Sequence, residues 1–132
     1  MRDLLMARIA IATLLALAAC GDDASRSASP ADTIAAWRSA GLTPAAFAPL
    51  TGEPGLGDTC VRGTVDGVDT TLCRYADDAA ARAARPAGLA AIGETTGAAL
   101  IAGPVLLVVA DRQHVDPSGR TINRITRTFQ GR

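Results

Sequence analysis

The pattern of apolar and polar residues divides the chain into an apolar N-terminal run, a polar segment and a region with helix and strand signals. Residues 9–19 are almost all apolar, whereas residues 21–29 are small or polar and show no periodicity. From residue 30 onward, apolar residues recur at the spacing of helices or strands. We therefore expect a cleaved signal segment at 1–19, a flexible tether at 20–29 and one small domain at 30–132.

The domain opens with the features of a helix start. Ser29 suits an N-cap, Pro30 the first helical position, and Asp32 supplies an acid three residues after the cap. Trp37 then lies on one face with an aliphatic residue three positions before it, and Gly41 follows as a left-handed ending. We expect Trp37 to pack in the core, and a surface position that contacts a partner is the alternative.

Residues 43–57 contain three prolines and three glycines, a composition that excludes a helix. We expect this segment to be an irregular loop held down by isolated apolar residues, of which Phe47 is a candidate interaction residue. A short edge strand around residues 45–48 is the alternative.

The segment from Cys60 to Tyr75 predicts a β-hairpin, because Asp66-Gly67 between two β-forming runs is typical of a two-residue type I′ turn. With that turn, Cys60 faces Cys73 as a non-hydrogen-bonded pair, whose Cα atoms stand about 4.5 Å apart. A disulfide spans that separation, so we predict a Cys60–Cys73 bond.

The two-residue period of the hairpin assigns its side chains to opposite faces. The core face is expected to carry Val61, Val65, Val68 and Leu72. The other face, expected to be at least partly exposed, carries Cys60, Arg62, Thr64, Asp69, Thr71, Cys73 and Tyr75. Arg62 and Tyr75 are therefore candidate interaction residues.

The second half of the domain predicts a helix at 77–85 that is stopped by Pro86, followed by an irregular connection up to residue 96. Residues 105–110 form an apolar run typical of a central strand buried on both faces. Residues 97–101 fit either a short helix or a strand, and we favour a strand at 98–101 that pairs with 105–110.

Asp116-Pro117 predicts the start of a last helix, which is strongly amphipathic. Its inward face is expected to carry Ile122, Ile125 and Phe129, and its outward face Arg120, Arg124 and Arg127. The predicted order is helix, hairpin, helix, hairpin, helix. This order predicts an α+β domain, with an antiparallel sheet built from two hairpins and helices mainly on one face.

The N-terminal run has the features of an export signal, since Arg8 precedes an apolar stretch too short to span a bilayer. Leu17-Ala18-Ala19-Cys20, at its end, resembles the lipobox of bacterial prolipoproteins, in which the cysteine is diacylated and becomes the new N-terminus. The resemblance covers only the first twenty or so residues and implies lipid attachment at Cys20. An ordinary signal peptide is the alternative. Translation from Met6 is a further prediction. From Met1, Asp3 partly cancels the charge of Arg2 in a segment that should be basic.

The same resemblance implies a lipid-anchored protein that faces the periplasm or the cell surface. In lipoproteins of bacteria with two membranes, an aspartate directly after the cysteine favours retention in the inner membrane. This chain has Gly21 at that position, which makes the outer membrane the expected location.

Charge and chemistry narrow the expected function. The chain has 13 basic and 13 acidic residues, so it lacks the net basic charge of nucleic-acid binders. It has a single histidine, His114, which we expect to be exposed; a weak cation site with Asp111 and Asp116 is the alternative. We find no pattern for catalysis, a metal or a cofactor, and expect a non-enzymatic binding module. A structural or stress-related envelope protein and a small-molecule carrier are the alternatives.

The candidate interaction surface draws on the outer face of the hairpin, the proline-rich segment and the outward arginines of the last helix, and either of the first two is the expected binding surface. Its members are Arg120, Arg124, Arg127, Tyr75, Arg62 and Phe47. The expected partners are an envelope protein, a glycan or an anionic lipid. A solvated helix face without a partner is the alternative for the arginines.

Overall fold

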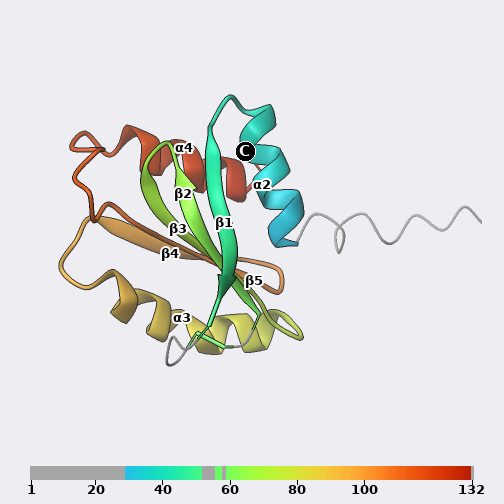
Figure 1. The fold of residues 1–132 in the computed structure, drawn as a ribbon. Helices are drawn as coiled ribbons and strands as arrows, with labels where there is room; N and C mark the ends of the chain where they lie inside the picture. The colour runs from blue at the N-terminus through green and yellow to red at the C-terminus, as the bar shows by residue number, and fades with distance from the viewer. Residues whose placement is uncertain (1–28, 52–55, 58, 132) are drawn as a thin grey trace, which may run out of the picture.

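The computed structural model describes residues 29–51, 56–57 and 59–131, which form one α+β domain around a five-stranded antiparallel sheet. The elements in chain order are α2 (Pro30–Ser39), β1 (Pro44–Leu50), β2 (Cys60–Val65), β3 (Val68–Arg74), α3 (Asp78–Ile92), β4 (Gly97–Ala102), β5 (Val105–Ala110) and α4 (Arg120–Phe129). The strand order is β1-β2-β3-β5-β4 (Figure 1). The predicted signal segment, Cys20 and almost all of the predicted tether lie outside the described residues.

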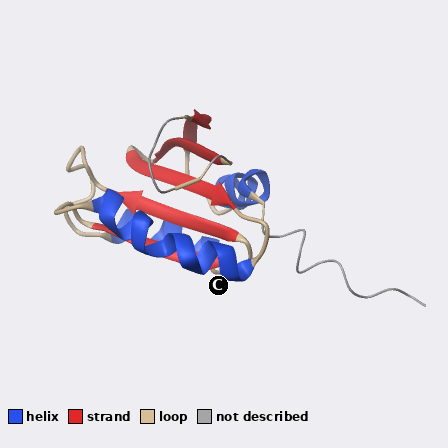
Figure 2. Ribbon diagram, turned by 90° about the horizontal axis from the view of Figure 1, so that it is seen from below, coloured by secondary structure: helices blue, strands red, loops and turns tan. Residues whose placement is uncertain are grey.

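Helices cover both faces of the sheet. Side chains that alternate along β5 enter two separate apolar clusters: Val105, Leu107 and Val109 pack with α2 and α4, whereas Leu106 and Val108 pack with α3. All six residues of β5 are buried, as predicted for a central strand. Figures 1 and 2 show α3 along one face of the sheet, with α2 and α4 on the other. The α+β class and the antiparallel sheet are confirmed.

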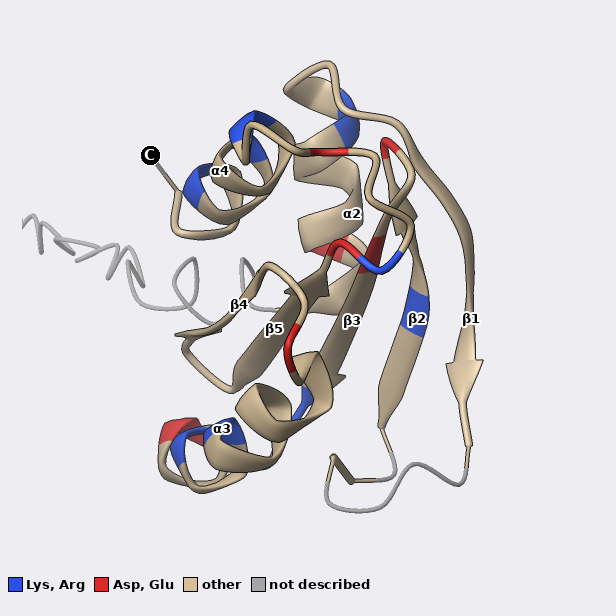
Figure 3. Cartoon of the chain, turned by 90° about the vertical axis from the view of Figure 1, so that its left-hand side faces the viewer, with Lys and Arg blue, Asp and Glu red and all other residues tan. Residues whose placement is uncertain are grey.

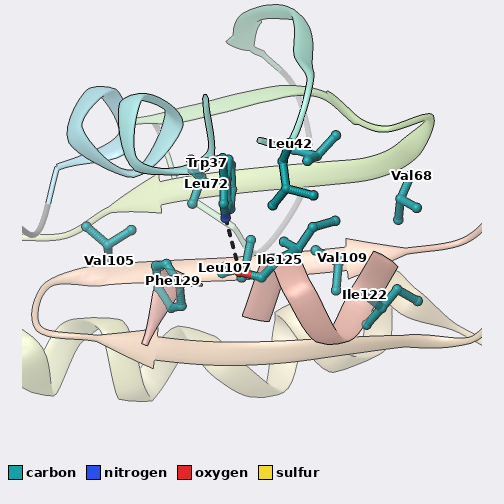
Figure 4. Close-up of a cluster of buried hydrophobic side chains, with 11 residues drawn as sticks. Trp37, Leu42, Val68, Leu72, Val105, Leu107, Val109, Ile122, Ile125 and Phe129 are labelled. Carbon is teal, nitrogen blue, oxygen red and sulfur yellow. Dashed lines mark hydrogen bonds between the residues drawn. The ribbon is translucent and has the colours of Figure 1, made fainter. Parts of the chain in front are cut away.

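The larger cluster is centred on Trp37, which is fully buried as predicted. It contains apolar residues from α2, from α4 and from the facing side of the sheet (Figure 4). Ile122, Ile125 and Phe129 of α4 point into it, which confirms the predicted inward face of that helix. At the start of α2 the Ser29 hydroxyl accepts a hydrogen bond from the Asp32 amide, which confirms the predicted cap.

The hairpin of β2 and β3 has the predicted register. Val65 pairs with Val68 across Asp66-Gly67, and both turn residues have positive φ, as a type I′ turn requires. Cys60 pairs with Cys73, and a disulfide joins them with their Cα atoms 4.0 Å apart. The predicted disulfide is therefore confirmed.

The expected exposure of the disulfide face is wrong at that end of the hairpin. Cys60 and Cys73 are buried beneath α3, in the cluster that also contains Leu56 and Ile92. The prediction placed the helices mainly on one face of the sheet, whereas α3 covers the face that carries the disulfide. Farther along the hairpin, Arg62, Thr64 and Asp69 are half-buried.

The loop predicted at 43–57 is wrong for residues 44–50, which form the edge strand β1. Pro44 and Pro49 face Val65 and Val61 at positions where a backbone N–H would point away from β2, so neither proline removes a ladder bond. The alternative of a short edge strand is the correct one. Residues 52–55 lie outside the described part.

A bulge in β1 explains how Phe47 reaches the core. Ala45 pairs with Thr64 and Ala48 with Arg62, which leaves two residues of β1 opposite Gly63. A Cβ at Gly63 would lie 2.6 Å from the Ala45 carbonyl oxygen and 2.8 Å from the ring of Phe47. Glycine is therefore required for Phe47 to lie across β2.

The helix predicted to stop at Pro86 continues to Ile92, with Pro86 inside it. Pro86 is exposed, and the packing of the helix on β4 and β5 compensates for its missing amide. Gly88 brings the helix against the sheet, because a Cβ there would lie 2.9 Å from Val108 Cγ2. The irregular connection is therefore confined to residues 93–96. Residues 97–102 form the favoured strand, paired with β5.

The last helix begins at Arg120, four residues later than Asp116. Asp116 nevertheless caps it, because its carboxylate accepts hydrogen bonds from the amides of Thr121 and Ile122 at 3.1 and 2.9 Å. The predicted N-cap position is therefore wrong, because Gly119 occupies it, and Asp116 reaches the first-turn amides from farther back in the loop.

Candidate interaction surface

The outward face of α4 carries Arg120, Arg124 and Arg127, all exposed. Spacings of four and three residues place them within about 60° around the helix axis, opposite the buried apolar residues. Figure 3 shows basic positions along α4. We call these three residues the arginine stripe.

The arginine stripe has no acidic partner in the described part of the chain. The ten residues of α4 include no aspartate or glutamate, and no salt bridge there involves the stripe. The acid nearest in sequence, Asp116, is buried and directs both carboxylate oxygens to helix amides. Within the described residues, the positive charge of the stripe therefore faces solvent without a direct counter-ion.

Arg124 also has a structural contact. Its Nη2 donates a hydrogen bond of 3.1 Å to the carbonyl oxygen of Ala40, at the end of α2. This bond satisfies one of the carbonyl groups left free at a helix C-terminus and joins α4 to α2. Because the acceptor is a neutral carbonyl, Arg124 keeps its full charge.

The other candidate residues do not join the stripe. Phe47 stacks on Trp37 with ring centroids 6.3 Å apart, so it belongs to the edge of the core. Arg62 lies on β2 and donates a hydrogen bond from Nε to the Thr71 hydroxyl at 3.1 Å. Tyr75 packs against the cluster beneath α3. The six predicted residues therefore divide between the two faces of the sheet.

Tyr75 is held by a hydrogen bond from its hydroxyl to the carbonyl oxygen of Leu56. Burial raises the pKa of Tyr75 above its ordinary value, because the phenolate is poorly solvated at this position. Tyr75 also lines a hollow of about 400 Å³ with Arg74 and Thr59. A second hollow, of about 450 Å³, lies between α2 and β1 and is lined by Ile34, Arg38 and Phe47 among others.

The loop before α4 does not form a cation site. Asp111 accepts hydrogen bonds from the amides of Val115 and Asp116, both at 2.9 Å, and Asp116 caps α4. These carboxylates are therefore engaged with backbone donors, while His114 is exposed. Across the described residues, no group of three or more His, Cys, Asp or Glu side chains is arranged to hold a metal.

The sequence does not predict one side-chain contact with a sheet edge, that of Arg85. Its Nε donates a hydrogen bond of 2.9 Å to the carbonyl oxygen of Ala99, in the edge strand β4. That carbonyl points outward from the sheet, because Ala99 and Val108 form a non-hydrogen-bonded pair. The sequence predicts that the helix ends at Pro86, and no local pattern links Arg85 to β4.

Comparison with family models, with curated proteins and with solved structures finds no match to this chain. Function is therefore inferred from the residues and geometry of the chain itself.

Proposed function

We propose that this chain is an envelope lipoprotein, held on a membrane by diacylated Cys20, whose folded domain is a non-enzymatic binding module for an envelope component. The bond between Cys60 and Cys73 carries the proposal. Structural disulfides persist in exported proteins and are rare in the cytosol. The bond also accounts for two of the three cysteines and leaves Cys20 for the lipid.

The apolar run and the Leu17-Ala18-Ala19-Cys20 motif support export and lipidation. No helix in the described part of the chain combines the length and hydropathy needed to cross a membrane. Two or more acyl chains anchor a protein stably, whereas one chain does so only marginally. Diacylation of Cys20 therefore supplies a sufficient anchor, and Gly21 favours the outer membrane as its location.

The exposed arginine stripe supports the binding role. It concentrates three positive charges on one helix of a chain with no net charge. Such segregation favours an acidic or phosphate-bearing partner over a neutral one. The proposed partner is an anionic lipid, a glycan or an acidic protein surface of the envelope.

The experiment that tests the anchor is metabolic labelling with an alkyne fatty acid in the native host, followed by membrane fractionation. The expected result is label on the wild type, its loss on Cys20→Ser, and retention of the label on Cys60→Ala/Cys73→Ala. Label that persists on Cys20→Ser, or wild-type protein that is unlabelled and soluble, contradicts the anchor.

The binding role is tested separately by photo-crosslinking in cells. A photoreactive residue at exposed Asn123, beside the arginine stripe, is expected to capture a defined lipid, glycan or protein species. The matched control is exposed Ala83 on α3, on the opposite face of the sheet. Equal capture of bulk neighbours at both positions contradicts a dedicated binding surface.

A further inference from the structure

We propose that the arginine stripe docks the domain on the anionic phospholipid headgroups of the membrane that holds the anchor, and so fixes the orientation of the domain. The inference rests on the proposed lipid anchor and deepens it by naming the surface and its occupant. It is carried by the exposure of the stripe, by the absence of a salt bridge to it among the described residues and by the position of α2.

The first described element after the tether lies on the same side of the sheet as the stripe. α2 is the first described element after the tether, and nine residues separate Cys20 from Pro30. α2 and α4 cover one face together and are joined by the bonds from Trp37 to Ile125 and from Arg124 to Ala40. A lipid at Cys20 therefore brings this helical layer, rather than α3, to the bilayer.

The length of the tether permits the contact. A flexible segment of about ten residues has a root-mean-square reach of roughly 15–20 Å, which is less than the width of a domain of this size. The stripe runs about 10 Å along α4, at 1.5 Å per residue. Its three guanidinium groups therefore reach the headgroups together when α4 lies parallel to the membrane.

The chemistry of the stripe fits phosphate groups. A guanidinium group donates paired hydrogen bonds to phosphate oxygens, and it is more weakly hydrated than the ammonium group of lysine. Three arginines are too few to hold an untethered protein on a membrane. They are sufficient to select one orientation of a domain that its lipid already holds at the surface.

The opposite face does not offer the same contact. The arginines of α3 are Arg82 and Arg85; Arg85 bonds to Ala99, and Asp78 lies on the same helix.

A matched control uses two other arginines. Arg74 and Arg82 are exposed and lie outside α4. Arg74→Gln/Arg82→Gln therefore removes the same total charge as Arg120→Gln/Arg127→Gln without touching the stripe. Both pairs leave the bond from Arg124 to Ala40 in place.

The test uses the acylated protein, reconstituted in vesicles of phosphatidylcholine with or without phosphatidylglycerol. A fluorophore is attached to a cysteine at Asn123, beside the stripe, or at Ala83 on α3 as the control position. Because Cys60 and Cys73 are bonded and Cys20 is acylated, the introduced thiol is the only reactive one. Nitroxide-labelled headgroups quench a fluorophore that lies at the membrane surface.

The expected result is strong quenching at Asn123 in vesicles with phosphatidylglycerol, weak quenching at Ala83, and loss of the difference in high salt. Each arginine is expected to raise the ratio of docked to undocked protein about fivefold. Arg120→Gln/Arg127→Gln therefore lowers that ratio by about 25-fold. Arg74→Gln/Arg82→Gln is expected to leave that ratio within about twofold of the wild type.

Equal quenching at both positions, or no effect of Arg120→Gln/Arg127→Gln, overturns the docking and shows that the stripe takes another partner or none. Mass spectrometry of the same preparation distinguishes this outcome from failure of the proposed function. If residue 20 carries no acyl group, both the anchor and the docking are wrong. If it is acylated and quenching does not depend on the stripe, only the docking is wrong.

Discussion

The indole Nε1 of Trp37 donates a hydrogen bond of 3.1 Å to the carbonyl oxygen of Ile125, although 88 residues separate them in sequence (Figure 4). The bond is buried and joins α2 to α4 through the centre of the larger cluster. The helix that follows the tether is therefore fixed to the helix that carries the arginine stripe. An orientation of α4 set by the proposed docking would be transmitted to the whole domain through this bond.

Trp37→Phe is expected to lower the free energy of unfolding by about 2 kcal/mol, through the lost hydrogen bond and the cavity left by the smaller ring. Urea unfolding followed by circular dichroism measures it, because the variant lacks the only tryptophan of the chain. A loss below about 0.5 kcal/mol would show that the bond from Trp37 to Ile125 contributes little.

Removal of the disulfide is expected to destabilise the domain without changing its fold. Cys60 and Cys73 are 13 residues apart, and closing a loop of this length stabilises by roughly 3 kcal/mol in the chain-entropy model. Cys60→Ala/Cys73→Ala should therefore unfold at lower urea concentration than the wild type. Equal midpoints for the two proteins would mean that the buried cluster beneath α3, and not the covalent bond, holds this end of the hairpin.

Gly63→Ala is expected to cost roughly 3 kcal/mol, because the added Cβ meets the backbone of Ala45 and the ring of Phe47. Gly119→Ala is the matched control. A Cβ at Gly119 meets nothing within 4 Å, so the change costs only about 1 kcal/mol for its left-handed backbone. If the two variants prove equally stable in thermal unfolding, the close approach of the β1 bulge and Phe47 to Gly63 is wrong.

Arg85→Ala is expected to promote association of the domain. β4 is an edge strand without a charge or a proline, and Arg85 covers its outward carbonyl at Ala99. Sedimentation velocity over a concentration series should show dimers for Arg85→Ala. Arg82→Ala, an exposed arginine one turn earlier on the same helix, should stay monomeric under the same conditions. Identical behaviour of the two variants would remove the protective role of Arg85.

Tyr75 is expected to ionise above its ordinary pKa of about 10, because burial disfavours its phenolate. Because the folded-state pKa of Tyr75 lies above its unfolded value, the contribution of Tyr75 to the free energy of unfolding is fully present at pH values below the unfolded pKa. That contribution is lost as the pH rises through the folded pKa, so stability should fall at alkaline pH. Tyrosinate absorbance reports this residue alone, since it is the only tyrosine. A midpoint at or below 10 contradicts the burial, and Tyr75→Phe should lessen the alkaline loss.

Local signals in the sequence were sufficient for elements whose determinants are adjacent along the chain. Asp66-Gly67 determines its own turn, and the turn determines the pairing of Cys60 with Cys73. Ser29 and Asp32 likewise define the start of α2. In these cases each residue acts on neighbours whose distance in sequence is known.

The sequence was not sufficient where distant contacts decide the outcome. β1 is a strand because β2 supplies its hydrogen bonds and Gly63 supplies room for Phe47, and neither is visible in residues 43–57. α3 passes through Pro86 because its far half packs on the sheet, with Gly88 against Val108. Strand and helix propensities read from a short window omit such packing.

The same distinction between local and distant determinants applies to the candidate interaction residues. The helical spacing of Arg120, Arg124 and Arg127 predicts their common face, and the structure has it. The stacking of Phe47 on Trp37 and the bond from Arg62 to Thr71 depend on pairs of elements, so local spacing in the sequence does not predict them.

The most direct test of the account is mass spectrometry of the protein isolated from host membranes and digested without reduction. The predicted result is an N-terminal peptide that begins at Cys20 and carries a diacylglyceryl group on its sulfur, together with a disulfide-linked pair of peptides that contain Cys60 and Cys73. An unmodified Cys20, or a peptide that continues uncut through Ala18-Ala19-Cys20, would contradict the lipid anchor on which the proposed function depends.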